Sequence, residues 1–524
     1  MSQAQYRDWH RLERARDPML RLLNVPHAHA PTRRSDLPAG ASWRETTPET
    51  ARDFSALCLF FGQSLRETDA TPIGLIHSSW GGARAQAWIT ADRLSKIGAY
   101  AGELSALEAF AADPVGGVGA FGEQWRAWWR RVQPQAPEPW LQPESLDLRT
   151  DSQIFRDWRS FDDPAMARFT GLVWYVARAR LDAEAAQSGS ARISLGGVDE
   201  IDAVWINGRF IGSSFGWGDL RDYAVPPDVL RPGANDIVVA AYSSWEAGGL
   251  VGPAEKAAII VGDGAAIRLR DWRYSAAPQS IGAPPGPPWS SVAGVTTIGN
   301  AMMAPLAGQR VKAAIWYQGE SNTGSADDYE DLLGALVDDW REYFGPDLKV
   351  VIVQLPAFGA PVFAPGGSGW ASLRDKQRRF AASDPSVGLA VTVDLGDAAD
   401  LHPANKRPVA RRVVESMRRL FAGADVAWRA DGGSPLGARR EGEDVVIAFR
   451  DDLATLGGAD PWGFELCAGQ ACAPAPARID ARAIRLEAGG ASADRVRYLW
   501  ADAPAPGVYA AGAPITPFEI EIGK

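Results

Sequence analysis

Three short blocks of small and polar residues in this chain carry groups that suit ester chemistry. In chain order they are residues 77–82 (His-Ser-Ser-Trp-Gly-Gly), residues 316–322 (Trp-Tyr-Gln-Gly-Glu-Ser-Asn) and residues 400–403 (Asp-Leu-His-Pro). Acyl transfer needs a nucleophile, a base that takes its proton, a group that orients the base, and donors for the developing oxyanion. A glycine turn, an amide-bearing turn and a late acid–histidine pair supply every part except the nucleophile.

His402 is the candidate base. It follows an apolar stretch, residues 389–393, and an acidic loop that holds Asp394, Asp397 and Asp400. Taken alone, a histidine near three carboxylates also fits a surface ion pair. The assignment of His402 as the base therefore depends on its spacing from the other two blocks. The main-chain N–H of Gly81 or Gly82 is the candidate oxyanion donor, because glycine lets the backbone approach a ligand closely. The alternative is that these glycines only form a tight turn.

The visible serines are poor nucleophile candidates. Ser64 follows Gly-Gln, but as a nucleophile it requires a strand over residues 57–61, which leaves only residues 65–71 before the next strand. A parallel crossover takes a dozen or more residues, so this geometry fails. Ser78 and Ser79 lie in the glycine turn and are little better.

Alternating strand and helix patterns position the three blocks. Apolar residues at helical spacing predict a helix that spans Phe54 to Leu65, and short apolar runs predict strands that end at the first two blocks. Strands are predicted at 72–76, 311–316, 349–353 and 388–393, with a helix at 329–344. This alternation predicts a doubly wound parallel sheet, whose ligands bind at the carboxyl ends of the strands.

The intervening and final parts of the chain are β-rich. Short alternating strands separated by turn residues predict a β-sandwich inserted into the α/β domain and a small β-domain after it. The predicted domains are residues 1–134 and 286–424 for the two parts of the α/β domain, 135–285 for the sandwich, and 425–524 for the C-terminal β-domain.

Composition limits the partners. The net charge is −10 and basic residues do not cluster, which argues against nucleic acid and anionic membranes. No apolar run approaches the roughly 20 residues that cross a bilayer. The 21 Trp are either core or sugar-contacting residues. No Cys/His group has zinc spacing, so no metal is expected, and Cys467 and Cys472 are either a disulfide or two free thiols.

Together the three blocks resemble the SGNH (GDSL-like) hydrolases, and most closely the sialate O-acetylesterase family. The resemblance runs from about residue 15 to the end, and residues 204–212 resemble the jelly-roll, galactose-binding-like domains of glycoside hydrolases. It implies an SGNH-type doubly wound sheet with an inserted jelly roll. In the family the nucleophile lies in a Gly-Gln-Ser-Asn-Met block. Met1 matches its last residue, so we expect the serine, and the N-terminal part around it, to be absent from this chain as written.

The resemblance also assigns roles to single residues. It implies His402 as base and Asp400 as orienting acid, with Asp397 in reserve, because the usual Asp-x-x-His spacing finds Ala399 here. It implies a side-chain N–H of Gln318 or Asn322 as an oxyanion donor beside the glycines. Trp80 and Glu320 are possible substrate contacts, and Glu320 is also a second possible acid, although in the family it looks structural. Asn300 and Arg374 match further family positions, with scaffold or substrate contact as alternatives.

The expected function is that of a carbohydrate esterase, which removes O-acetyl groups from sialic acid or another acetylated glycan by a Ser-His-Asp mechanism without a cofactor. The alternatives are a non-catalytic carbohydrate-binding protein and an inactive truncated gene product. The polar N-terminus is unlike a signal peptide. A periplasmic or secreted location is expected only if the full-length gene encodes a signal peptide.

Overall fold

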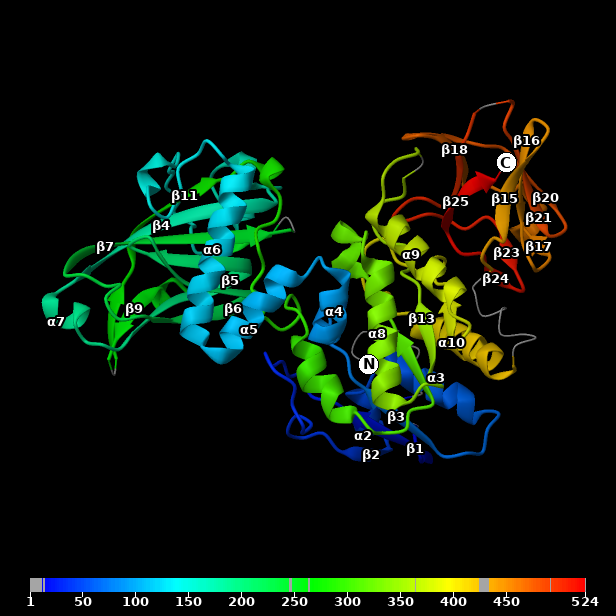
Figure 1. Cartoon of the computed structure of the whole chain (residues 1–524), viewed down its shortest axis with the longest axis horizontal. Helices are drawn as coiled ribbons and strands as arrows, with labels where there is room; N and C mark the ends of the chain where they lie inside the picture. The colour runs from blue at the N-terminus through cyan, green and yellow to red at the C-terminus, as the bar shows by residue number, and fades with distance from the viewer. Residues whose placement is uncertain are drawn as a thin grey trace. The chain divides into compact units, whose positions relative to one another are not determined.

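The computed structural model describes Leu12 and residues 15–244, 247–262, 264–362, 364–423, 433–490 and 492–523. The chain forms two compact units, shown in Figure 1. The first comprises Met1–Ala28, Arg33–Ile97 and Ile298–Lys524, and the second comprises His29–Thr32 and Gly98–Thr297. Met1, on which the expectation about the missing serine rests, lies outside the described residues.

Two parallel arrangements carry the three sequence blocks in the first unit. In one sheet, with the order β2-β1-β3, β1 runs parallel to β3; the second sheet has the parallel order β12-β13-β14. Their strands are β1 (Asp17–Asn24), β2 (Trp43–Thr46), β3 (Ile73–His77), β12 (Ala313–Trp316), β13 (Lys349–Val353) and β14 (Val387–Ala390). The fold is therefore mixed α/β. Among the described residues, β3 and β12 each keep one edge without a partner strand, so the single predicted sheet is divided in two.

One apolar cluster covers strands of both sheets. It joins buried side chains of α3 and α10 to those of β1, β3, β13 and β14, such as Phe60, Val413, Leu75 and Val351. The helices of this unit are α2 (Pro48–Arg52), α3 (Ala56–Arg66), α4 (Ala91–Ile97), α8 (Tyr329–Phe344), α9 (Gly369–Ser383) and α10 (Lys406–Phe421). Because α3 and α10 pack on strands of both sheets, the two sheets share one core.

The second unit is built on one eight-stranded sheet and has its own helices. Its main sheet has the order β10-β9-β5-β7-β4-β11, and β6 and β8 also pair with β5. The strands are β4 (Gly171–Leu181), β5 (Ala191–Ile206), β6 (Arg209–Val225), β7 (Gly233–Ser243), β8 (Gly249–Gly252), β9 (Ala258–Val261), β10 (Ala265–Arg268) and β11 (Arg270–Ala276).

Two helices that precede the strands belong to this unit. Helices α5 (Ala101–Ala112) and α6 (Pro114–Val132) lie in Gly98–Thr297, so the unit begins well before the predicted boundary at residue 135. The reason is apolar burial: α6 carries aromatic side chains into a cluster with Trp174 and Trp205 of the sheet. The six tryptophans in this cluster are core residues: Trp125, Trp128, Trp129, Trp140, Trp174 and Trp205.

The C-terminal segment forms an eight-stranded antiparallel-rich sheet with the order β19-β18-β22-β25-β15-β16-β21-β20. Its strands are β15 (Gly437–Glu441), β16 (Asp444–Ala448), β18 (Phe464–Ala468), β19 (Ala471–Pro474), β20 (Ala477–Asp480), β21 (Ala483–Glu487), β22 (Arg495–Tyr498) and β25 (Phe518–Gly523). A small sheet of β17 (Leu453–Ala454), β23 (Tyr509–Ala510) and β24 (Ala513–Pro514) accompanies it. Cys467 and Cys472 face each other on β18 and β19 and form a disulfide. The predicted boundary at 424/425 lies outside the described residues.

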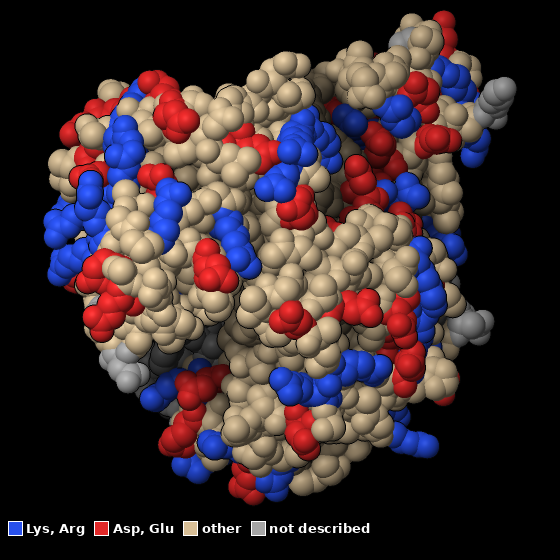
Figure 2. Space-filling view, turned by 60° about the vertical axis from the view of Figure 1, so that its left-hand side comes forward, with Lys and Arg blue, Asp and Glu red and all other residues tan. Residues whose placement is uncertain are grey.

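The surface carries charges of both signs, as the amino-acid composition does. Acidic and basic side chains are interspersed over the face drawn in Figure 2, where the described residues form no continuous basic band. Among the described residues, no helix combines the length and the apolar character that a membrane crossing requires.

The disulfide gives a simple prediction. The chain has three cysteines, and Cys58 on α3, which is partly buried, is the free one. We therefore expect titration of the unfolded, unreduced protein with a thiol reagent to detect one thiol per chain, and three after reduction. Three thiols without reduction would contradict the pairing.

Arg374 on α9 gives a second prediction. This guanidinium is fully buried and donates to the carbonyl oxygens of Leu355, Pro356, Ala501 and Asp502 at 2.6–2.8 Å. Arg374→Met would leave these oxygens without their donor, so we expect the free energy of unfolding to fall by roughly 3 kcal/mol in denaturant titrations.

The matched control is Arg379→Met on the same helix. Arg379 is half-exposed and pairs with Glu330 at 3.0 Å, and we expect its loss to cost no more than about 0.5 kcal/mol. Equal losses for the two variants would show that the carbonyl cluster does not stabilise the fold.

Candidate functional site

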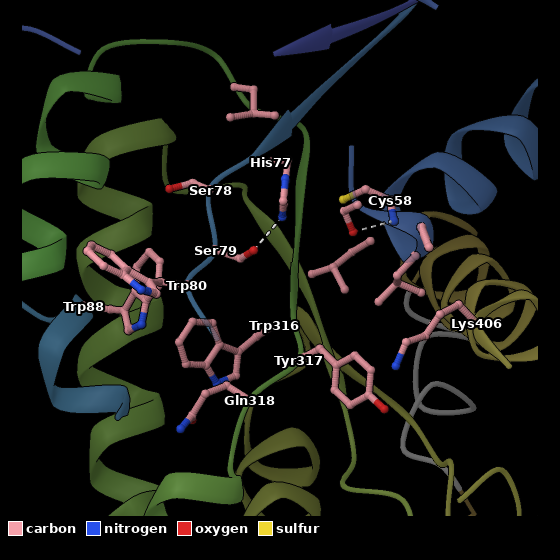
Figure 3. Close-up of a pocket in the computed structure, with 15 residues that line it drawn as sticks. Cys58, His77, Ser78, Ser79, Trp80, Trp88, Trp316, Tyr317, Gln318 and Lys406 are labelled. Carbon is pink, nitrogen blue, oxygen red and sulfur yellow. Dashed lines mark hydrogen bonds between the residues drawn. The ribbon is translucent and has the colours of Figure 1, made fainter. Parts of the chain in front are cut away.

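A pocket of about 300 Å³ opens at the carboxyl ends of β3 and β12. Figure 3 shows side chains from both strand ends and from α3 and α10 around it. The lining residues are Ser55, Ala56, Leu57, Cys58, Ile76, His77, Ser78, Ser79, Trp80, Trp88, Ile315, Trp316, Tyr317, Gln318 and Lys406. Two of the three sequence blocks therefore meet where parallel strands end, as expected for an α/β ligand site.

The glycine turn follows β3 directly. Gly82 has φ +76°, a left-handed conformation that side chains other than glycine rarely adopt. Gly81 has no heavy atom within 4 Å of the place where a Cβ would stand, so space beside its backbone is open. The turn thus leaves room for a ligand to approach the main chain, as the predicted role of Gly81 and Gly82 requires.

The amide-bearing turn holds the glycine turn in place. The Nε2 of Gln318 donates to the Ala83 carbonyl at 2.9 Å and to Oδ1 of Asn322 at 2.8 Å. Ser321 Oγ donates to the Gly82 carbonyl at 2.9 Å. Both N–H groups of the Gln318 amide are therefore engaged within the protein, although Gln318 lines the pocket.

Asn322 is enclosed in the same network. Its side chain is 1% exposed, accepts from the Ala85 N–H at 3.0 Å and donates to Gln86 Oε1 at 3.1 Å. The sequence analysis assigned Gln318 and Asn322 as possible oxyanion donors. The structure gives both amides partners within the protein.

Glu320 lies in an enclosed, charged environment. Burial raises the pKa of its carboxyl, while the N–H groups of Glu320 and Gly319 and the charges of His402 and Lys406 act in the opposite direction. Burial lowers the pKa of Lys406, and Glu320 and Asp400 oppose that change. Lys406 Nζ also lies 5.2 Å from the centre of the Tyr317 ring. The charge of Glu320 in the second sequence block therefore interacts with that of His402 in the third.

The third block lies on the loop between β14 and α10. His402 is exposed, and its main-chain N–H donates to Oδ1 of Asp400 at 2.8 Å. Asp397 accepts in the same way from the Ala399 N–H at 2.9 Å, and Asp394 forms an ion pair with Arg412. These bonds shape the loop. Asp400 is thus placed beside His402, but the hydrogen bond that joins them runs to the backbone and not to the imidazole.

The other predicted contact residues divide between the pocket and the scaffold. Trp80 lines the pocket and stacks on His27, with ring centroids 4.4 Å apart. Asn300 is buried in the π-helix Gly299–Met303, where its carbonyl accepts from the Arg34 N–H. The Arg374 guanidinium donates to the four carbonyl oxygens described above. Neither Asn300 nor Arg374 lines the pocket.

The sequence analysis did not single out Asn24, His77, Tyr317 and Lys406 as site residues. His77 and Tyr317 lie inside the two quoted blocks, and that position was their only signal in the sequence. No signal in the sequence marks Asn24 or Lys406. Asn24 lies near the site because β1 pairs with β3, and Lys406 lies near it because α10 begins there.

Comparisons with known proteins bear on this site. Residues 294–416 match the family model of carbohydrate esterases described as sialic acid-specific acetylesterase. The segment contains the amide-bearing turn and His402, and the predicted resemblance to the sialate O-acetylesterase family is confirmed.

Individual relatives agree with the family. Sialate O-acetylesterases from Homo sapiens and Pongo abelii are each 30% identical to this chain over 155 residues, which cover 26% of the chain and 30% of either relative. The chain thus matches less than a third of their length. A carbohydrate acetylesterase from Xanthomonas citri shares the fold, with a TM-score of 0.56 and 20% identity, over 99% of this chain and 76% of that protein. The expected enzyme class, a carboxylic ester hydrolase, is the class of these relatives.

The raised pKa of Glu320 predicts a pH-dependent effect on stability. A carboxyl whose pKa is higher in the folded than in the unfolded state destabilises the fold when ionised, and this cost disappears as the pH falls through the folded pKa. Glu320→Gln removes the charge, so we expect it to stabilise the protein by on the order of 1 kcal/mol near pH 7 and much less at about pH 4.

Thermal unfolding at the two pH values measures this difference. Glu443→Gln is a control, because Glu443 is an exposed residue of the turn between β15 and β16. A destabilising effect of Glu320→Gln at pH 7 would mean that the ionised carboxyl is favourably paired in the fold.

Proposed function

We propose that this chain forms the acyl-binding part of a carbohydrate esterase that removes O-acetyl groups from sialic acid or another acetylated glycan. The family match of residues 294–416 supports an acetyl ester as the substrate. The pocket, with its open glycine turn, supports the attack of a nucleophile on a small acyl group at the ends of β3 and β12. The sugar itself and the hydroxyl that carries the acetyl group are left open.

The open edges of β3 and β12 carry this proposal. Both strands line the same pocket, both run into it with their carboxyl ends, and α3 and α10 cover the two sheets as one layer. A further parallel strand between β3 and β12 would complete a doubly wound, SGNH-type sheet and would end at the pocket. We infer that the nucleophilic serine is at the end of such a strand, in a segment outside the described residues.

His402 is the proposed base. A serine at the pocket would lose its proton to the imidazole as it attacks the acetyl carbonyl, and the main-chain N–H groups of Gly81 and Gly82 would donate to the oxyanion. The imidazolium would then protonate the departing sugar oxygen, and water would release acetate in a second, equivalent cycle. No metal or organic cofactor takes part in this scheme.

Two carboxylates compete for the orienting role. Asp400 is joined to the backbone of His402, and it reaches the imidazole only if the loop adjusts. Glu320 is enclosed near His402, and its charge interacts with that residue. The proposed mechanism keeps Asp400 as the first choice and adds Glu320 as the group that favours the imidazolium.

The disulfide supports an oxidising compartment for the protein. Cys467 and Cys472 are bonded across a hairpin, and such bonds persist in periplasmic and secreted proteins. We therefore propose an extracytoplasmic location, which is also where acetylated glycans are met.

The test uses the protein expressed from its complete gene. We expect His402→Ala to lower acetate release from an O-acetylated sialic acid or from acetylated xylan by roughly 10³-fold, because general-base catalysis contributes about that much. His29→Ala, in the other compact unit, is the control and is expected to keep full activity.

The outcomes separate the candidate functions. Comparable acetate release by His402→Ala and the unaltered protein would reject His402 as the base. If the unaltered protein retains acetylated glycan on an affinity column but releases no acetate, the chain is a carbohydrate-binding protein and the esterase proposal fails.

A further inference from the structure

Three polar side chains at the mouth of the pocket form a hydrogen-bonded chain that the proposed mechanism does not use. Ser79 Oγ lies 2.5 Å from His77 Nε2, and His77 Nδ1 lies 2.7 Å from Asn24 Oδ1. Figure 3 shows Ser79 turned toward His77 and Ser78 turned away from it. The arrangement of hydroxyl, imidazole and orienting amide is the one that nucleophilic hydrolases use to activate a side chain.

The parallel register of two strands brings these residues together. Asn24 is the last residue of β1, His77 is the last residue of β3, and the two are directly paired in the sheet. The carboxyl ends of parallel strands meet at one sheet edge, so the hydroxyl that follows β3 lies at the pocket. The constellation is thus built on regular structure and not on a long loop.

The hydrogen bonds determine which imidazole nitrogen carries the proton. Asn24 Nδ2 donates to the Asp53 carbonyl at 3.3 Å, so its Oδ1 faces His77 and accepts from Nδ1–H. The neutral ring then presents the lone pair of Nε2 to Ser79, whose hydroxyl donates to it. This is the tautomer that a general base needs.

The surroundings keep His77 fixed and neutral. Its ring packs edge-to-face on Phe54, with centroids 5.4 Å apart. Burial lowers the pKa of His77 to about 4, so the ring is uncharged at neutral pH. A base with so low a pKa takes protons weakly, and turnover through it is expected to be slow.

Ser79 itself is open to a ligand. Its side chain is exposed, and its carbonyl is fixed by His27 Nε2 at 3.1 Å, where His27 stacks on Trp80. The N–H groups of Gly81 and Gly82 follow two and three residues later, beside the open space described above. A nucleophile, a base, an orienting amide and main-chain donors therefore occur within this chain alone.

We propose that Ser79 is a nucleophile in its own right, with His77 as its base and Asn24 as the positioning residue, and that it accepts acyl groups from small carboxylic esters. This activity is independent of the proposed function, because it requires neither His402 nor a serine outside the described residues.

The chain, the ester and water supply every atom and proton that the reaction needs. Nε2 of His77 takes the Ser79 proton while Oγ bonds to the carbonyl carbon. The ester C–O bond then breaks, and the alcohol leaves with the proton from Nε2. Water attacks the acyl-serine by the same route, which releases the carboxylic acid and restores the Ser79 hydroxyl.

A fluorophosphonate probe tests the proposal, because it traps activated serines as stable adducts. The purified chain would be treated with the probe, digested, and mapped by mass spectrometry. We expect an adduct on Ser79, no adduct at that peptide in Ser79→Ala, and a labelling rate at least about tenfold lower in His77→Gln. Asn24→Ala removes only the restraint on the ring and should also slow labelling, which covers the case that His77→Gln fails to fold.

Two matched variants complete the design. Ser78→Ala changes the neighbouring serine, whose Oγ is buried without a hydrogen-bond partner among the described residues, and it should label as fast as the unaltered chain. His402→Ala should also leave Ser79 labelling unchanged. An unlabelled Ser79, or a rate insensitive to His77→Gln and Asn24→Ala, would overturn the proposal. Loss of acetate release in His402→Ala with an unlabelled Ser79 would leave the proposed function standing and reject this one.

Discussion

The arrangement of the site depends on one apolar layer. Helices α3 and α10 bury their side chains against strands from two separate sheets, and Phe60, Val413 and Val351 belong to the same core cluster. Hydrophobic burial has no direction of its own, but a shared layer forces both sheets to present their carboxyl ends to one region. The glycine turn after β3, the amide turn after β12 and the histidine loop after β14 are therefore positioned by the packing of this layer.

Hydrogen bonds then fix the geometry of the turns that packing brings together. Gln318, Ser321 and Asn322 on the second block hold carbonyl and amide groups of the glycine turn, from Gly82 to Gln86. Buried amides with all their partners in place define one geometry, since each lost bond would leave an unpaired group. The second block thus fixes the position of the first.

Much of the local structure could be predicted from the sequence. The periodicity of residues 329–344 and the apolar run 349–353 gave the bounds of α8 and β13 as the structure has them. Helix α6 was not predicted; its first half contains Gly116, Gly117, Gly119 and Gly122, and glycine has a low helix propensity. The His77–Asn24 pair was also beyond prediction, since 53 residues separate the two and only the strand register brings them together.

The hydrogen bonds of the buried Arg374 affect how this protein can unfold and whether its C-terminal β-domain can be lost during evolution. A single guanidinium bonds carbonyl groups from the loop after β13 and from the segment after β22. Separation of the two segments would break the hydrogen bonds from the guanidinium to Ala501 and Asp502. The α/β part and the C-terminal β-domain should therefore melt as one cooperative body, and an evolutionary lineage could not discard the β-domain without first replacing this arginine.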